Sequence, residues 1–310
     1  MTDLTKLKSF LYAAEHLNFT KAAQQLHVTQ PTISHHIKSI EDEMDVILFD
    51  RSDYNIRITD AGRLLLPWAR KLIRQSIEMQ EMMKSLQDNI VGGLRIACST
   101  TAGKYVLPQL AARFSQSHPG VRVNILRCNP DTVIPNLLDN EANLGVVSYE
   151  ALEKNMELQE FFNDYISLIV PSDHPFAMRH QISPEELIDE PIIMREPTSG
   201  TRRVVLAELA KHDISIEDMN IFMTIGNAEA IVQTVAAGYG ISFASTLAID
   251  CPLQSGSVAS IDVQGVNLQR KIYMLRKRLD DPYRPQEAFW SFVHDPSNLD
   301  LLQLSKACDL

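Results

Sequence analysis

The N-terminal part of the chain shows short apolar patterns at helical intervals. The positions that define the first are Leu4, Leu7, Leu11, Ala14 and Leu17. Recurrence every three or four residues predicts a helix over residues 4–17. Thr20 offers an N-cap, a side chain that accepts a hydrogen bond from the free N–H groups of a helix, and predicts a second helix over 21–26.

A third helix is predicted from residue 30, because Pro31 suits the first turn, where its missing N–H has no cost. Ile33, Ile37 and Ile40 form its apolar face. Its other face is short, hydrogen-bonding and free of acid, and carries Gln30, Thr32, Ser34, His35 and Lys38. Two short helices around a tight turn form a helix-turn-helix, whose second helix enters the major groove of DNA. The alternative is a helical hairpin packed into a core.

Residues 48–59 predict a two-stranded hairpin, or wing. Phe49, Ile56 and Ile58 suit the strands, and residues 53–55 have turn chemistry. Arg51 and Arg57 flank the hairpin, where they can reach DNA phosphates.

A long helix is predicted from Asp60, with Thr59 as its N-cap. Its seam alternates by four and three residues through Leu65, Ala69, Leu72, Ser76, Met79, Met83, Leu86 and Ile90. A sustained period of 3.5 residues predicts a coiled-coil dimer, with Leu65, Leu72, Met79, Met83 and Leu86 in the interface. The alternative is a helix within one core. Pro67 is expected to kink the first turns.

After Gly93, apolar runs alternate with amphipathic segments. Strands are predicted at 94–98, 121–126, 144–148, 166–170, 192–194, 222–225, 241–244 and 272–275. Helices are predicted at 104–116, 131–138, 201–211, 228–237 and 285–292. Such alternation predicts an α/β domain with parallel sheets covered by helices, long enough for two lobes.

Composition narrows the class of protein. The chain has 310 residues, 45% apolar, which suggests two globular domains. It shows no apolar run long enough to span a membrane and no secretory signal at its start, and its four cysteines stand singly, so we expect a cytoplasmic protein. The net charge of −10 divides into −1 for residues 1–90 and −9 for the rest. Residues 21–40 contain no acid, a basic face suited to nucleic acid.

Two hydroxyl-rich motifs follow predicted strands and open helices. The residues expected to bind an effector are Ser99, Thr100 and Thr101, then Thr198, Ser199, Gly200, Thr201 and Arg202, with Asn227 before a further helix. Helix N-termini at the carboxyl ends of parallel strands favour anions, so these motifs predict a cleft for a small carboxylate or phosphate. The alternative for each motif is helix capping alone.

The sequence gives little support for a catalytic site or a metal site. Residues 240–244 resemble a nucleophile elbow but run into a strand, so Ser242 is expected to be a buried strand residue. His35 and His36 are adjacent, which places them on different helix faces and makes them poor joint metal ligands. We therefore expect no enzyme activity, no metal and no cofactor.

The chain resembles the LysR-type transcriptional regulators. The matching segments are 19–23, 28–34, Ile37, Glu41, 48–51 and 58–62 in the first part, and Leu107-Pro108, Phe114, His118-Pro119, 144–146, His174-Pro175, 199–202 and 238–241 in the second. His35 departs from the pattern, because an arginine usually follows the serine of the Gln-Pro-x-x-Ser motif.

The resemblance implies a winged helix-turn-helix, a dimerising linker helix and a two-lobed effector domain like that of periplasmic binding proteins. The expected boundaries are 1–59, 60–90 and 91–310, with lobe I at 91–163 and 265–300 and lobe II at 164–264. It also implies a homotetramer, a dimer of dimers, on promoter DNA.

Side-chain chemistry divides the expected DNA contacts by role. Gln30 can read adenine through two hydrogen bonds, whereas the cations position the protein on phosphate. The expected DNA-binding residues are Lys21, Gln30, Pro31, Thr32, Ser34, His35, Lys38, Arg51 and Arg57. The favoured interpretation is a DNA-binding transcriptional regulator modulated by a small anionic metabolite. The alternative is a cytosolic solute-binding or enzyme-like α/β protein with an accessory helical domain.

Overall fold

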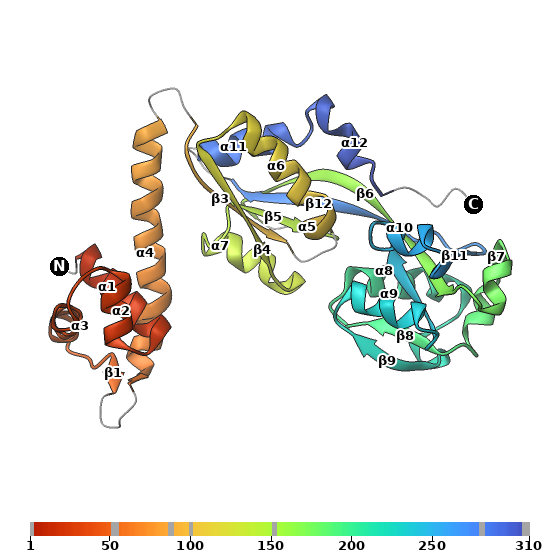
Figure 1. Cartoon of the computed structure of the whole chain (residues 1–310), viewed down its shortest axis with the longest axis horizontal. Coiled ribbons are helices and arrows are strands. Elements are labelled where there is room, and N and C mark those ends of the chain that lie inside the picture. Colours follow the sequence, from red (N-terminus) through yellow and green to blue (C-terminus); the bar gives the residue numbers. More distant parts are fainter. Residues whose placement is uncertain are drawn as a thin grey trace. The chain divides into compact units, whose positions relative to one another are not determined.

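The computed structural model describes residues 3–50, 56–85, 90–98, 102–150, 154–278 and 283–305. The chain forms two compact units, Met1–Asn89 and Ile90–Leu310 (Figure 1). In the first unit the elements are α1 (Leu4–His16), α2 (Phe19–Gln25), α3 (Gln30–Met44), β1 (Phe49–Asp50), β2 (Arg57–Ile58) and α4 (Asp60–Ser85).

The cap of α2 differs from the one expected. The side chain of Asn18, not that of Thr20, accepts hydrogen bonds from the backbone N–H groups of Thr20 at 2.9 Å and Lys21 at 3.0 Å. An asparagine two residues earlier offers the better acceptor geometry, so the helix begins at Phe19. Phe19 is therefore helical and packs edge-on against Phe49.

The helix-turn-helix and the wing share one apolar core. Its buried members include Phe10, Ile33, Ile37, Ile40, Leu48, Phe49, Ala69 and Ile73. β1 and β2 pair antiparallel, as the wing prediction requires, with Phe49 opposite Ile58. Gly62 lies so close to this hairpin that a Cβ there would come within 2.5 Å of the Leu48 carbonyl oxygen, so only glycine fits.

The linker helix begins where the sequence predicts. Thr59 Oγ1 accepts from the Gly62 N–H at 3.1 Å, which confirms its role as the N-cap. The helix continues through Pro67. The helix is described as far as Ser85, residues 86–89 lie outside the described residues, and Ile90, where its end was predicted, is no longer helical.

The second unit is an α/β domain with two lobes. Its strands are β3 (Gly92–Cys98), β4 (Val121–Arg127), β5 (Leu144–Val147), β6 (Met156–Pro171), β7 (Gln181–Ile182), β8 (Ile192–Arg195), β9 (Ile221–Ile225), β10 (Ile241–Ser245), β11 (Val258–Val263) and β12 (Gln269–Lys277). Its α-helices are α5 (Ala102–Tyr105), α6 (Leu107–Ser117), α7 (Val133–Leu138), α8 (Gly200–Leu209), α9 (Ala228–Ala236), α10 (Thr246–Gln254), α11 (Arg284–Phe292) and α12 (Leu299–Leu302).

The sheets are mixed, which corrects the expectation of parallel sheets. The strand order is β4-β3-β5-β12-β6-β10-β8-β9, with β11 on β6 and β7 on β11. β3 pairs parallel with β4 and β5, but β12 runs antiparallel to β5 and β6, and β10 runs antiparallel to β6. The antiparallel pairs arise because β6 and β12 are long return strands that connect the lobes.

β6 was underestimated from the sequence, because only its second half is a continuous apolar run. Residues up to Tyr165 pair with β12 in lobe I, and residues from Ile166 pair with β10 in lobe II. In lobe I, α6 and α11 cover one face of the sheet and α7 covers the other (Figure 1). The single helix expected at 104–116 is divided into α5 and α6 at Val106.

Candidate functional site

The recognition helix α3 turns its polar face to solvent. Ile33, Ile37 and Ile40 are fully buried, so the helical register exposes the opposite face. On that face Gln30, Pro31, His35 and Lys38 are exposed, and Thr32 and Ser34 are half-buried. The sequence-predicted side chains on α3 therefore lie on one accessible surface.

Local hydrogen bonds define the helix start and the orientation of its histidines. Thr29 Oγ1 lies 2.8 Å from Thr32 Oγ1 and caps the Thr32 N–H at 3.4 Å, which occupies part of the Thr32 hydroxyl. His36 Nδ1 lies 2.8 Å from Ser9 Oγ on α1. The His36 ring therefore points toward α1, inside the domain, whereas His35 is exposed to solvent.

The other predicted DNA contacts divide into two groups. Lys21 and Arg57 are exposed, at α2 and at the wing strand β2, whereas Arg51 lies outside the described residues.

The sequence analysis assigned no structural role to Glu41. Its Oε1 accepts from the backbone N–H groups of Leu48 at 2.8 Å and Phe49 at 3.3 Å, which ties the start of the wing to the recognition helix.

The exposed apolar stripe of α4 differs in part from the predicted seam. Leu65 and Ala69 pack into the core of their own domain, because they face α1. The exposed apolar side chains follow a neighbouring line through Leu64, Trp68, Leu72, Met79 and Met83. Leu65 is thus half-buried against its own domain, whereas Leu64 and Trp68, which the sequence analysis did not assign to the seam, are exposed; Leu86 lies outside the described residues. The helical period alone does not distinguish the side chains that face the core from the exposed stripe, because the two rows lie next to each other on α4.

The second unit contains a cavity of about 340 Å³ between its lobes. Its lining includes Gly103, Lys104, Tyr105, Arg127, Asn129, Arg195, Glu196, Ser199, Gly200, Thr201, Asn227, Glu229 and Arg270. The structure thus brings together Ser199, Gly200, Thr201 and Asn227, as the sequence predicts. Ser99, Thr100 and Thr101 lie outside the described residues.

Two predicted cavity residues are corrected. Arg202 does not line the cavity; its Nη1 donates to the Arg195 carbonyl oxygen at 3.0 Å. Thr198 is exposed and does not line it either. A helix start exposes only some of its side chains to a cleft, because successive residues are about 100° apart.

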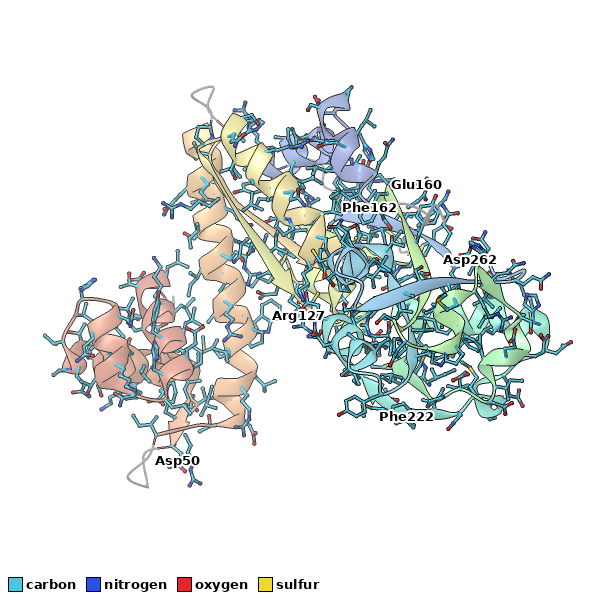
Figure 2. The ribbon with its side chains drawn as sticks, turned by 45° about the vertical axis from the view of Figure 1, so that its right-hand side comes forward. Asp50, Arg127, Glu160, Phe162, Phe222 and Asp262 are labelled. Atoms are coloured by element: carbon cyan, nitrogen blue, oxygen red, sulfur yellow. The ribbon has the colours of Figure 1, made fainter. Side chains whose placement is uncertain are left out.

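The cavity contains cations that the sequence analysis did not assign. Among the described lining residues, four are cations (Lys104, Arg127, Arg195 and Arg270) and two are carboxylates (Glu196 and Glu229). Arg127, labelled in Figure 2, ends strand β4, and Arg195 ends strand β8. That position at the carboxyl end of a strand is a signal available in the sequence. Arg127 is an exposed side chain with no hydrogen bond or ion pair to the rest of the described chain.

Arg270 is the most buried of these cations. Only 6% of it is exposed; its Nε donates to Asp164 Oδ2 at 2.8 Å, and its Nη2 forms an ion pair with the same oxygen at 2.6 Å. Its Nη1 has no such partner in the described part of the chain and lies 2.9 Å from where a Gly200 Cβ would be. This places a free guanidinium N–H at the cavity wall beside the N-terminus of α8.

The hydroxyl groups at α8 are also available to a ligand. Ser199 and Thr201 are each 3% exposed, and Ser199 makes no capping hydrogen bond with its side chain. Neither hydroxyl is among the fully buried atoms that lack a hydrogen-bond partner. Both are therefore accessible from the cavity that their residues line. Asn227 instead uses its Oδ1 to cap α9, accepting from Glu229 N at 2.9 Å and Ala230 N at 3.1 Å.

Glu229 connects the lobes across the cavity. Its carboxylate forms an ion pair with Lys104 and accepts from the Tyr105 hydroxyl at 3.2 Å. The hydrogen bond from Lys104 holds the pKa of Glu229 below its usual range. Burial, reinforced by the Glu229 charge, raises the pKa of Tyr105 to about 12. Tyr105 therefore remains a proton donor at neutral pH.

The described residues offer little to metal or nucleophile chemistry. No group of three or more His, Cys, Asp or Glu side chains among them is arranged to hold a metal ion. Ser242 is 1% exposed in β10 and donates to the Ile193 carbonyl oxygen at 2.6 Å, which confirms a structural role. Burial also raises the pKa of the Cys128 thiol at the cavity. Within the same residues, no helix has the length and apolar character needed to cross a membrane.

Comparison with known families accounts for both units. The family model for the bacterial regulatory helix-turn-helix protein, lysR family, matches residues 4–63, and that for the LysR substrate binding domain matches residues 87–296. The chain belongs to the LysR family. This LysR-type protein is therefore a DNA-binding transcriptional regulator with an effector-binding domain.

Relatives and solved structures agree with this assignment. The transcriptional activator CmpR of Synechocystis sp. is 31% identical over 294 residues, covering 94% of this chain and 95% of CmpR. CbnR complexed with its target DNA has a TM-score of 0.75 at 21% identity, covering 94% of this LysR-type chain and 98% of CbnR, which shows the fold. The CcmR regulatory domain of Synechocystis PCC6803, in complex with 2-PG, has a TM-score of 0.59 at 28% identity and covers 70% of this chain and 99% of that domain.

Proposed function

We propose that this regulator binds a small anionic metabolite in the cavity between its lobes and that binding changes its occupancy of promoter DNA. The observation that carries the proposal is the Nη1 of Arg270, a cationic N–H that makes no hydrogen bond or ion pair among the described residues and is accessible at the wall of that cavity. A charged donor in this position favours a ligand that supplies an acceptor.

The surrounding groups select for negative charge. The Ser199 and Thr201 hydroxyls and the N-terminus of α8 lie on the same wall as Arg270. A helix N-terminus favours an anion by about 0.3–1 kcal/mol. Arg127 adds a cation that makes no hydrogen bond or ion pair among the described residues, and the cavity lining holds four cations against two carboxylates, so the cavity attracts anions although the whole chain carries a net charge of −10.

On the DNA side, the exposed face of α3 is proposed to enter the major groove. Gln30 has the amide that pairs with adenine, and Lys21, Lys38 and Arg57 are exposed cations that suit phosphate. Thr32, Ser34 and His35 complete the polar face, with Pro31 at its start. The exposed imidazole of His35 can donate a hydrogen bond to a phosphate or a base.

Assembly is proposed to follow from the exposed stripe of α4. Five large apolar side chains on one face of a helix indicate a dimer interface, since water-exposed apolar surface of this extent favours burial. A dimer of dimers would then place four recognition helices on a promoter. We further propose that the protein acts in the cytoplasm, without a cofactor and without enzyme activity, as expected of a regulator that meets both DNA and metabolites.

The test is a ligand screen by thermal shift on the full chain. The probes are 2-PG, inorganic phosphate and glycerol as the neutral compound. We expect an anionic probe to raise Tm with a dependence on its concentration, because a ligand that binds only the folded state stabilises it. The stabilising anion should also change the mobility shift of DNA from upstream of the regulator's own gene. Stabilisation that persists unchanged when Arg127 and Thr201 are both replaced by Ala would contradict the proposed site.

A further inference from the structure

A single buried carboxylate joins three segments of the effector domain. Asp164 is 1% exposed. Its Oδ2 accepts from Arg270 of β12, and its Oδ1 accepts from Ser245 Oγ at 2.5 Å and from Ser305 Oγ at 3.0 Å. Ser245 ends β10 in lobe II, whereas Ser305 belongs to the segment that follows α12. The carboxylate is thus a junction between both lobes and the C-terminal segment.

This junction lies where the chain crosses between the lobes. Asp164 pairs with Arg270 in the lobe I ladder, and Ile166 pairs with Ser245 in the lobe II ladder. Tyr165, which pairs with Gln269, ends the lobe I ladder, so the two ladders adjoin directly along β6. A rotation of one lobe against the other must therefore change the distance between Asp164 and Ser245.

Ser305 is held in place by three hydrogen bonds. Besides its contact with Asp164, its Oγ accepts from the Tyr165 N–H at 2.9 Å and lies 2.9 Å from Thr246 Oγ1. A hydroxyl has one donor and two acceptor positions, so these partners saturate it and direct its proton to Asp164. Ser305 is 5% exposed, and Leu301 in the same segment is buried in the lobe I core.

The segment that supplies Ser305 lies beyond the residues that the family model for the substrate binding domain matches. The match to the LysR substrate binding domain ends at residue 296. Residues 297–305, which we call the C-terminal strap, begin in the turn Pro296–Asn298, include α12 and end at the crossing. The junction is therefore completed by a segment outside the matched domain.

We propose that the C-terminal strap is a clasp on the hinge between the lobes, and that Ser305 is a positioning residue for the effector cavity. Ser305 fixes the Asp164 carboxylate, and Asp164 fixes two nitrogens of the Arg270 guanidinium. Because the guanidinium is planar, fixing Nε and Nη2 also fixes the direction of Nη1 into the cavity. Loss of the clasp loosens the crossing and lets Nη1 move. The step through Arg270 rests on the proposed function; the effect on the hinge does not.

Hydrogen–deuterium exchange of the full chain tests the clasp without a ligand. A hydrogen bond to a charged group corresponds to about a ten-fold or larger factor in an opening equilibrium. We expect Ser305→Ala to accelerate exchange of the β6 and β12 amides around residues 164–168 and 269–272 by about that factor. Ser305→Thr, which keeps the hydroxyl, should restore slow exchange.

The matched control removes another hydroxyl from the same strap. Ser297 Oγ donates to Asp295 and does not reach the crossing, so Ser297→Ala should leave β6 exchange at the parental rate. If Ser305→Ala fails to fold, Thr246→Val removes one partner of the Ser305 hydroxyl and should accelerate the same amides to a smaller extent. Unchanged exchange at the crossing in the folded variants, or acceleration confined to α12, overturns the proposal.

Titration with inorganic phosphate and 2-PG tests the coupling to the cavity. Ser305→Ala should lower the affinity for the stabilising anion several-fold, and Ser305→Thr should restore that affinity. If exchange at the crossing becomes faster while the affinity for the anion equals that of the parent, the role of the strap at the hinge is supported and the coupling through Arg270 is overturned. If neither anion binds the parent at all, the proposed effector class fails while the exchange result still decides the clasp.

Discussion

Nη1 of Arg202 donates to the carbonyl oxygen of Arg195, 3.0 Å away, and the Arg202 side chain does not line the cavity. Arg202 follows Ser199, Gly200 and Thr201, which do line it, in the first turn of α8. The charge that reaches the cavity comes instead from strand ends, above all from Arg127.

The two arginines are therefore expected to behave differently. Arg127→Ala should weaken binding of the stabilising anion about ten-fold. The substitution removes a guanidinium that makes no hydrogen bond or ion pair with the described chain and that we expect to form a charge-assisted contact with the anion. Arg202→Ala should change affinity much less. Isothermal titration with the anion found in the thermal-shift screen measures both, and each substitution serves as the control for the other. A larger loss in Arg202→Ala would return Arg202 to the ligand site.

Base reading and phosphate contact should separate in DNA binding. Gln30→Ala should lose about 1–3 kcal/mol of discrimination at one base pair of each half-site. Lys38→Ala should weaken specific and random DNA alike and lower the salt slope by about one unit. Fluorescence anisotropy against both DNA types over a range of salt concentrations checks this. Unchanged sequence preference in Gln30→Ala would exclude Gln30 as the base reader.

The apolar stripe of α4 predicts which charge breaks the dimer. Met83→Glu and Trp68→Glu place a charge in the proposed interface, where burial without a partner is costly. We expect dissociation of the dimer and loss of tight DNA binding, with both units still folded. Light scattering together with circular dichroism measures these outcomes.

Ile77 supplies the control for that experiment. It is exposed and apolar, and it lies ~160° around the helix from Met79. Ile77→Glu should leave the dimer intact. Dissociation by Ile77→Glu alone would place the interface on the opposite face of α4.

The contact between Tyr105 and Glu229 predicts a late tyrosine titration. Folding raises the pKa of Tyr105 to about 12, so its contribution to stability is fully present below the unfolded pKa of about 10. That contribution is lost as the pH rises through the folded value. Absorbance near the phenolate band, taken as the difference between the parent and Tyr105→Phe, should show ionisation near pH 12.

Glu229→Gln provides the matching test of cause. The substitution removes the neighbouring charge but leaves Tyr105 partly buried, so its ionisation should move toward the ordinary value without reaching it. A transition that stays where it was would mean that burial alone sets the Tyr105 pKa.

The sequence determined the local elements of this protein because their causes are local. The spacing of Ile33, Ile37 and Ile40 sets which face of α3 is polar, and the cap at Thr59 sets where α4 begins. Hydroxyl residues after β8 marked one wall of the cavity for the same reason. Where two local signals competed, as at Asn18 and Thr20, the boundary moved by a residue or two.

Tertiary structure decided everything that depends on distant segments. Whether Leu65 or Leu64 faces its own core depends on where α1 packs, which helical period does not encode. Arg127, Arg195 and Arg270 lie on β4, β8 and β12, which are not neighbours in the sheet, and only the packing of the two lobes brings them to one cavity. The Asp164 junction needs β6, β10, β12 and the C-terminal strap at one point, and long-range chain packing alone brings them there.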